Sequence, residues 1–163
     1  MKTIDKYLQA VKLLHEVNNE TDTEELNQLP KYLYHLTSDE NYKNILMEGF
    51  LNPKYSKQSK RKKGIYLSDV ISVAENYRFF YELDEKVVIL KIKTSSLNED
   101  SFYPDDYELQ DFLNDGGWGV GEDIEYYRCY DVPWQLSLKW VNQIQYLEPI
   151  PISEINRNFY TNQ

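Results

Sequence analysis

Apolar residues near the N-terminus recur at the spacing of a helix. Within residues 4–17, Leu8, Val11 and Leu14 fall on one face and the lysines lie off it, which predicts an amphipathic helix. The next stretch, 18–27, is polar and acidic, and we interpret it as a connector.

Further along the chain, short apolar and aromatic runs predict strands. The first three runs are 32–36, 64–68 and 86–94, and the last of these contains four consecutive apolar residues before the pattern alternates. A final strand is predicted over 140–147, leading into Pro149-Ile150-Pro151.

A helix is predicted directly after the strand at 32–36. Ser38 or Asp39 can cap it, because a short oxygen side chain satisfies free amides at a helix start, and Gly49 is typical of a helix end. One face of this helix carries Tyr42, Ile45 and Leu46.

The remaining segments complete an α+β pattern. A second helix is predicted over 69–77 with Asp69 as its cap, the weakly periodic segment 98–125 is interpreted as a long connection, and the polar tail after Ile155 is expected to fray. Helices and strands do not alternate strictly, so we favour an α+β fold over a doubly wound sheet, in a single domain spanning 1–163.

Composition narrows the class of protein. The chain has 163 residues, 41% of them apolar, which suits one folded domain. Cys129 is the single cysteine, so the chain can form no internal disulfide. No apolar run approaches the roughly 20 residues that span a bilayer, and the N-terminus lacks the pattern of a signal peptide. We therefore expect a cytoplasmic protein that does not enter membranes, as a monomer or weak oligomer.

Charge is distributed unevenly along the chain. The net charge of −9 argues against broad binding to nucleic acid, which needs many contacts from Lys and Arg to phosphates. Six of the 18 basic residues fall within 54–63, whereas 98–127 holds ten acids and no base. This polarity could orient a charged ligand or partner; the alternative is two solvated loops of opposite sign.

Several kinds of site are disfavoured by the motifs. His15 and His35 are far apart and have no ligand partners at zinc spacing, so we expect no metal. No Walker or Rossmann glycine loop is present, and no strained serine turn supports a hydrolase triad.

Two segments carry more informative chemistry. Residues 34–38 place His35 in a predicted strand beside two hydroxyl residues, and residues 64–77 place Tyr66 on a strand and Tyr77 on the helix after it. The two tyrosines can face one slot and sandwich a planar ring, each stacking contact being worth roughly 0.5 to 1.5 kcal/mol. Gly64 permits close approach of the backbone to a flat ligand.

These segments resemble a known family. Residues 64–77, with the order Gly, apolar, Tyr, apolar, small, Asp and a helix ending Asn76-Tyr77, resemble the tyrosine segment of the poly(ADP-ribose) polymerase branch of ADP-ribosyltransferases. Residues 34–53 are similar to the histidine segment of bacterial and phage members, and 144–155 to the last strand and its turn.

The resemblance implies a split β-sheet core over 32–155, preceded by an N-terminal helix and followed by a tail at 156–163, and a site for NAD. His35 would bond a ribose hydroxyl of NAD, the Leu36 backbone would pair with the nicotinamide carboxamide, and Tyr66 and Tyr77 would cover the two faces of the ring. The NAD-binding set implied by the resemblance is His35, Leu36, Thr37, Tyr66, Leu67, Ser68 and Tyr77, with His35, Tyr66 and Gln143 as catalytic residues.

Two positions depart from the family. A Glu is usual near the start of the last strand, and that position falls on Gln143, or on Gln145 or Glu148 if the register shifts. A glutamine can neither act as a base nor stabilise a cationic transition state by its charge. Ala74 stands where a Ser often bonds the carboxamide, which should weaken binding by about 1 kcal/mol.

The resemblance implies a mono-ADP-ribosyltransferase that modifies a macromolecular acceptor, protein or nucleic acid, and releases nicotinamide. Two alternatives stay open: a module that binds NAD, ADP-ribose or a protein partner without turnover, and an NAD glycohydrolase. The related RNA 2′-phosphotransferases depend on several arginines, and the four in this chain disfavour that function.

Overall fold

The computed structural model describes residues 29–53, 64–106, 108–109, 112 and 132–161. The predicted helix at 4–17, the connector at 18–27, the basic stretch at 54–63 and much of the acidic segment lie outside the described residues.

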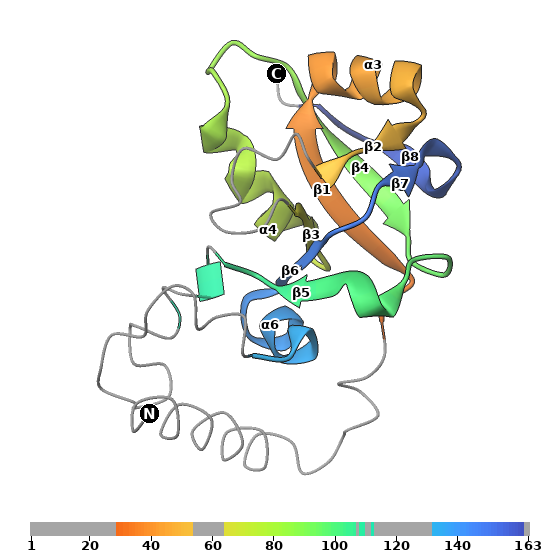
Figure 1. Cartoon of the computed structure of the whole chain (residues 1–163). Coiled ribbons are helices and arrows are strands. Elements are labelled where there is room, and N and C mark those ends of the chain that lie inside the picture. Colours follow the sequence, from red (N-terminus) through yellow and green to blue (C-terminus); the bar gives the residue numbers. More distant parts are fainter. Residues whose placement is uncertain (1–28, 54–63, 107, 110–111, 113–131, 162–163) are drawn as a thin grey trace.

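A six-stranded sheet forms the centre of the described protein (Figure 1). Its order is β5-β6-β3-β1-β4-β8, and each pair of neighbouring strands is antiparallel. The strands are β1 (Tyr32–Ser38), β3 (Ile65–Ser68), β4 (Val87–Lys93), β5 (Phe102–Pro104), β6 (Gln143–Tyr146) and β8 (Ile155–Thr161). A separate two-stranded sheet pairs β2 (Phe50–Leu51) with β7 (Ile150–Pro151). The fold is therefore α+β, as predicted.

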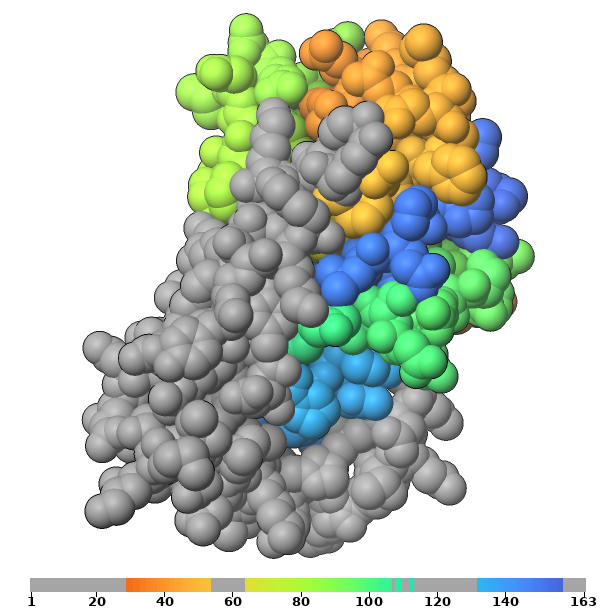
Figure 2. Space-filling model, viewed as in Figure 1, coloured from red at the N-terminus to blue at the C-terminus, as the bar shows by residue number. Residues whose placement is uncertain are grey.

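The helices are short and pack against this sheet. They are α3 (Asp39–Glu48), α4 (Ile71–Glu75) and α6 (Trp134–Val141), with 3-10 turns η2 (Asn76–Phe80), η3 (Glu99–Ser101) and η5 (Ile152–Glu154). On the face shown in Figure 2, α3 and β2 adjoin the blue C-terminal segment that includes β7.

Apolar side chains fill both faces of the central strands. On one face, Leu33, Leu90 and Ile92 belong to a cluster that Ile45 of α3 and Leu138 of α6 complete. On the other face, a smaller cluster consists of Leu36, Ala74, Tyr77, Val87 and Ile89. The apolar run that predicted the strand at 86–94 is thus buried on both sides, because α3 and α4 lie across opposite faces of the sheet.

The helix after β1 has the predicted ends. The Ser38 hydroxyl accepts a hydrogen bond from the Asn41 amide at 3.0 Å, so Ser38 is the cap. Gly49 ends the helix with φ of 87°, a conformation that favours glycine because it has no Cβ. Ile45 is buried, but Leu46 is 48% exposed, so the apolar face is narrower than predicted.

The prediction that Asp69 caps the next helix is wrong. Helix α4 begins at Ile71 and its N-cap, Val70, makes no side-chain hydrogen bond. The Asp69 carboxylate instead accepts a bond at 3.0 Å from the amide of Asn142, on the turn before β6. The Asp69 carboxylate is therefore engaged by the side chain of a residue distant in the sequence, and α4 has no side-chain cap.

The last part of the chain also differs from the prediction. Residues 134–141 form helix α6, which ends where Asn142 adopts φ of 59°, so the strand predicted over 140–147 spans only Gln143 to Tyr146. Residues 155–161 form β8, paired with β4, so the polar tail continues the sheet. An edge strand needs backbone hydrogen bonds more than apolar side chains, and its polar composition concealed it.

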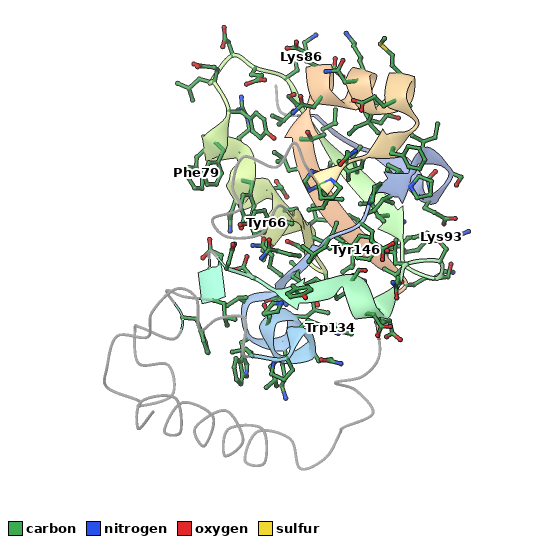
Figure 3. All side chains as sticks on the ribbon, in the orientation of Figure 1. Tyr66, Phe79, Lys86, Lys93, Trp134 and Tyr146 are labelled. Atoms are coloured by element: carbon green, nitrogen blue, oxygen red, sulfur yellow. The ribbon has the colours of Figure 1, made fainter. Side chains whose placement is uncertain are left out.

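The predicted long connection contains strand β5. Phe102 contacts the rings of Trp134 and Tyr146, each with ring centroids 5.0 Å apart, and Figure 3 labels the latter two residues. These contacts attach β5 and α6 to β6 and bring the residues that follow β5 to the edge of the candidate site.

Candidate functional site

The site lies where strands β1 and β3 separate. These strands are paired at one position, Tyr34 opposite Ser68, whereas β1 and β4 are paired at seven. Beyond that pair, Nδ1 of His35 bonds the Tyr66 carbonyl oxygen at 2.8 Å. Because a carbonyl can only accept, Nδ1 carries the hydrogen, and the neutral ring presents Nε2 as an acceptor.

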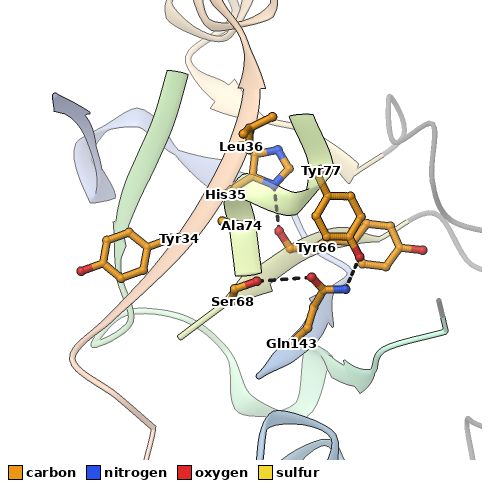
Figure 4. A pocket seen from close by; sticks show the side chains of 8 residues that line it. All are labelled: Tyr34, His35, Leu36, Tyr66, Ser68, Ala74, Tyr77 and Gln143. Atoms are coloured by element: carbon orange, nitrogen blue, oxygen red, sulfur yellow. Dashed lines mark hydrogen bonds between the residues drawn. The ribbon is translucent and has the colours of Figure 1, made fainter. Parts of the chain in front are cut away.

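A small cavity opens at this separation (Figure 4). Eight residues line it: Tyr34, His35, Leu36, Tyr66, Ser68, Ala74, Tyr77 and Gln143. The free space is about 10 Å³, room for about one water molecule. The sequence-predicted residues His35, Leu36, Tyr66, Ser68, Tyr77 and Gln143 are therefore brought together, with Ala74 of α4 beside them.

Two predicted binding residues lie elsewhere. Leu67 is fully buried in the apolar cluster on the opposite face of the sheet, as expected for the neighbour of Tyr66 on a strand. Thr37 is buried but does not line the cavity.

Tyr66 and Tyr77 face the same place, but their rings contact each other. The ring centroids lie 5.6 Å apart and the planes differ by 19°. A ring sandwiched between them would need about 7 Å, twice the thickness of an aromatic ring, so the predicted slot is closed in this structure. The stack continues outward from Tyr77 to Phe80 and then to Phe79, which is 66% exposed.

Gln143, at the start of β6, is the centre of the polar contacts in the cavity. Its amide nitrogen donates to the Tyr77 hydroxyl and, at 2.6 Å, to Oδ1 of Asp105, while its amide oxygen accepts from Ser68 at 3.3 Å. Gln143 itself is fully buried.

The two alternatives for the third residue lie outside the cavity. The amide of Gln145 donates to the Pro104 carbonyl at 3.1 Å. Glu148 accepts from Ser101 and from Asn98, and these hydrogen bonds lower the pKa of its carboxyl group. Among the three candidates, the structure brings Gln143 to the site.

Gly64 has a different neighbour from the flat ligand suggested by the sequence. A Cβ placed on Gly64 would lie 2.5 Å from Oε1 of Gln145. The absence of a side chain at Gly64 therefore allows β3 to pack closely on the Gln145 amide.

Burial shifts the pKa values of His35 and Tyr66, the two central side chains of the site. Desolvation lowers the pKa of His35 below its ordinary value of 6.5, although the bond to the Tyr66 carbonyl opposes this shift. Desolvation raises the pKa of Tyr66, and the negative charge of Asp106 raises it further. At neutral pH the site therefore holds an uncharged imidazole and an intact phenol.

Sequence reasoning missed two aspartates next to the cavity. Asp105 and Asp106 follow β5 and are fully buried; Asp106 accepts the hydrogen bond of the Tyr66 hydroxyl, and Asp105 that of Gln143. The available signal was an acidic pair directly after the short run Phe102-Tyr103-Pro104. The sequence pattern does not distinguish this pair from the other acids of the segment 98–127.

No protein-family model matches the chain, and neither the curated proteins nor the solved structures provide a match. Within the described ranges, no three or more His, Cys, Asp or Glu side chains are grouped to hold a metal ion. In the same part of the chain, no helix is both long and apolar enough to cross a membrane.

Proposed function

We propose that this protein is an NAD-dependent mono-ADP-ribosyltransferase with an ADP-ribosyltransferase-like split sheet. One observation carries the proposal: His35, Tyr66 and Gln143 lie on three neighbouring strands, β1, β3 and β6, and line one cavity with Tyr77. These are the residues for which the sequence resemblance implies contact with NAD, and they are separated by up to 108 positions (143 − 35) in the chain.

The chemistry of the donor set suits the nicotinamide end of NAD. Nε2 of His35 is an acceptor for a ribose hydroxyl, since Nδ1 is held by the Tyr66 carbonyl. The ladder between β1 and β3 ends at the Tyr34–Ser68 pair, which leaves the Leu36 backbone beside the cavity for the carboxamide. The two tyrosines supply stacking faces.

Ring entry requires Tyr77 to separate from Tyr66. The stack is worth about 0.5–1.5 kcal/mol and the bond from Gln143 to Tyr77 about as much. Opening therefore costs about 1–3 kcal/mol, a factor of roughly 5 to 150 in apparent affinity. Tyr77 lies on the short 3-10 turn η2, and an inserted ring gains two stacking contacts in place of one.

In the proposed reaction, the bond between ribose C1′ and the nicotinamide nitrogen breaks and nicotinamide leaves. A nucleophile on a macromolecular acceptor, protein or nucleic acid, bonds to C1′ and loses its proton. The protein's part is to position the ribose through His35 and to hold the ring against Tyr66.

The test is NAD turnover by purified protein in the presence of a cell lysate, with NAD labelled in its adenylate part. We expect labelled macromolecules and released nicotinamide, both lost in His35→Ala and Tyr66→Ala. Tyr32→Ala is the matched control: it lies on the same strand as His35, under Lys91 and outside the cavity, and should retain both signals. If the wild type produces no labelled macromolecules and releases no nicotinamide, the proposed enzymatic activity is refuted.

A second candidate is a module that binds NAD or ADP-ribose without turnover. The uncharged Gln143 favours it, because an amide carries no charge with which to stabilise a cationic transition state. Calorimetric binding of NAD without nicotinamide release would identify this module. Nicotinamide release without labelled macromolecules would identify an NAD glycohydrolase instead.

A further inference from the structure

A buried carboxylate lies directly behind the amide of Gln143. Oδ1 of Asp105 is 2.6 Å from Nε2 of Gln143, and both residues are fully buried. Gln143 lines the cavity and Asp105 does not, so the charge of Asp105 reaches the cavity through the Gln143 amide.

Asp105 is fixed from several sides. Its other carboxylate oxygen accepts a hydrogen bond from the Leu109 amide at 2.8 Å, and its own amide donates to the Ser137 hydroxyl at 2.8 Å. That hydroxyl donates in turn to the Gln143 carbonyl at 2.7 Å. Strand β5, helix α6 and strand β6 thus hold the carboxylate and the amide in one arrangement.

We propose that Asp105 is a positioning residue that supplies, through Gln143, a second buried negative charge to the nicotinamide site, beside that of Asp106. The inference rests on the proposed function and deepens it: the site would select the cationic pyridinium ring of oxidised NAD over the uncharged dihydropyridine of the reduced form. A fixed charge in a water-poor site interacts strongly with a nearby cation. In this arrangement Gln143 lines the cavity and Asp105 provides the charge, whereas a single Glu at position 143 would do both.

The experiment is a charge swap read by the affinities for NAD⁺ and NADH. We would measure both by calorimetry for the wild type, Asp105→Asn, Gln143→Glu and the double variant. We expect the wild type to bind NAD⁺ more tightly than NADH. In Asp105→Asn, the ratio of the two affinities should fall about tenfold. If Asp105 has a purely structural role, Asp105→Asn should lower the affinities for NAD⁺ and NADH by the same factor.

The double variant keeps the test decisive if Asp105→Asn folds poorly. It preserves one amide-to-carboxylate hydrogen bond and moves the charge to position 143, so we expect it to fold and to recover the preference for NAD⁺. Gln143→Glu alone places two carboxylates against each other, and we expect a lower midpoint in urea unfolding. Asp100→Asn, an exposed acid outside the cavity, is the matched control and should change none of these values.

The outcomes separate this inference from the proposed function. Equal affinities of the wild type for NAD⁺ and NADH would overturn the inference and leave NAD binding in place. A double variant that folds but does not recover the preference would also overturn it. A wild type that binds neither nucleotide would overturn the proposed function, and this inference with it.

Discussion

The two sides of strand β1 are built differently. Toward β4, seven consecutive positions pair, from Tyr32 with Lys93 to Ser38 with Val87, and five of the seven β4 side chains are buried and apolar. Toward β3, one position pairs, and His35 bridges to β3 with its side chain. A continuous ladder with apolar faces contributes stability, whereas an interrupted one exposes backbone groups and polar side chains to a cavity.

The polar residues follow the same division. Five of the nine buried polar residues of the described ranges lie on or next to β3, β6 and β5, namely Ser68, Gln143, Gln145, Asp105 and Asp106. The other four are Thr37 and Ser38 of β1, Thr94 directly after β4, and Ser137 of α6. Buried polar groups cost free energy unless every one finds a partner, and a complete network specifies one arrangement. We infer that the β4 side maintains the fold and that the β3 side maintains the geometry of the site.

The largest expected effect comes from breaking the β4 side. Leu90 is fully buried in β4, and Leu90→Ala should lower the free energy of unfolding by about 2–5 kcal/mol through lost burial and an unfilled cavity. Urea unfolding measures this cost. The proposed binding of NAD by the fraction that stays folded should be unchanged, and a specific loss of binding there would contradict the division between the two sides.

A smaller effect is expected from the β3 side. Tyr66→Phe removes the hydroxyl that donates to the buried Asp106 and should cost about 1–3 kcal/mol of unfolding free energy, since a buried carboxylate loses a donor. Tyr146→Phe is the matched control: its hydroxyl oxygen accepts a hydrogen bond from the backbone amide of the exposed Asn98 at 2.9 Å. We expect Tyr146→Phe to cost less, and equal costs would mean that the contact with Asp106 adds nothing.

The end of α3 gives a still smaller test on the apolar side. Gly49→Ala should cost about 1 kcal/mol, because φ of 87° is unfavourable for alanine while no atom lies near the added Cβ. Gly49→Asn should cost less, since asparagine tolerates this conformation. Thermal unfolding of both variants measures the difference, and a larger cost for asparagine would exclude backbone strain as the cause.

Local signals in the sequence were sufficient for much of the fold. The apolar runs predicted β1, β3 and β4, and Ser38 and Gly49 predicted the ends of α3. These features depend on residues close together in the chain. Strand β8 was missed because its pairing uses the backbone, and Asp69 was assigned to the wrong partner because Asn142 is 73 residues away.

The site was predictable to the extent that it follows motifs. His35, Tyr66, Tyr77 and Gln143 were named from the resemblance, and they line one cavity. Asp105 and Asp106 were not named, because a buried carboxylate and a solvated one look the same in an acidic segment. The closed stack of Tyr66 on Tyr77 was equally hidden, since it depends on a distance between two elements.

The smallest expected effect is a change in how stability depends on pH, and it tests the burial of His35. The folded protein holds the pKa of His35 below its ordinary value of 6.5, so protonation favours the unfolded chain. The stability that comes from the neutral ring is complete above pH 6.5 and is lost as the pH falls from there toward the folded-state pKa. In His35→Gln, which does not titrate, this loss should vanish. The difference between the two urea-unfolding profiles isolates His35, because the other titrating groups occur in both proteins. Parallel profiles below pH 6.5 would show that the imidazole is as well hydrated as in the unfolded chain, and the β3 side of β1 would then be open to solvent at the His35 position.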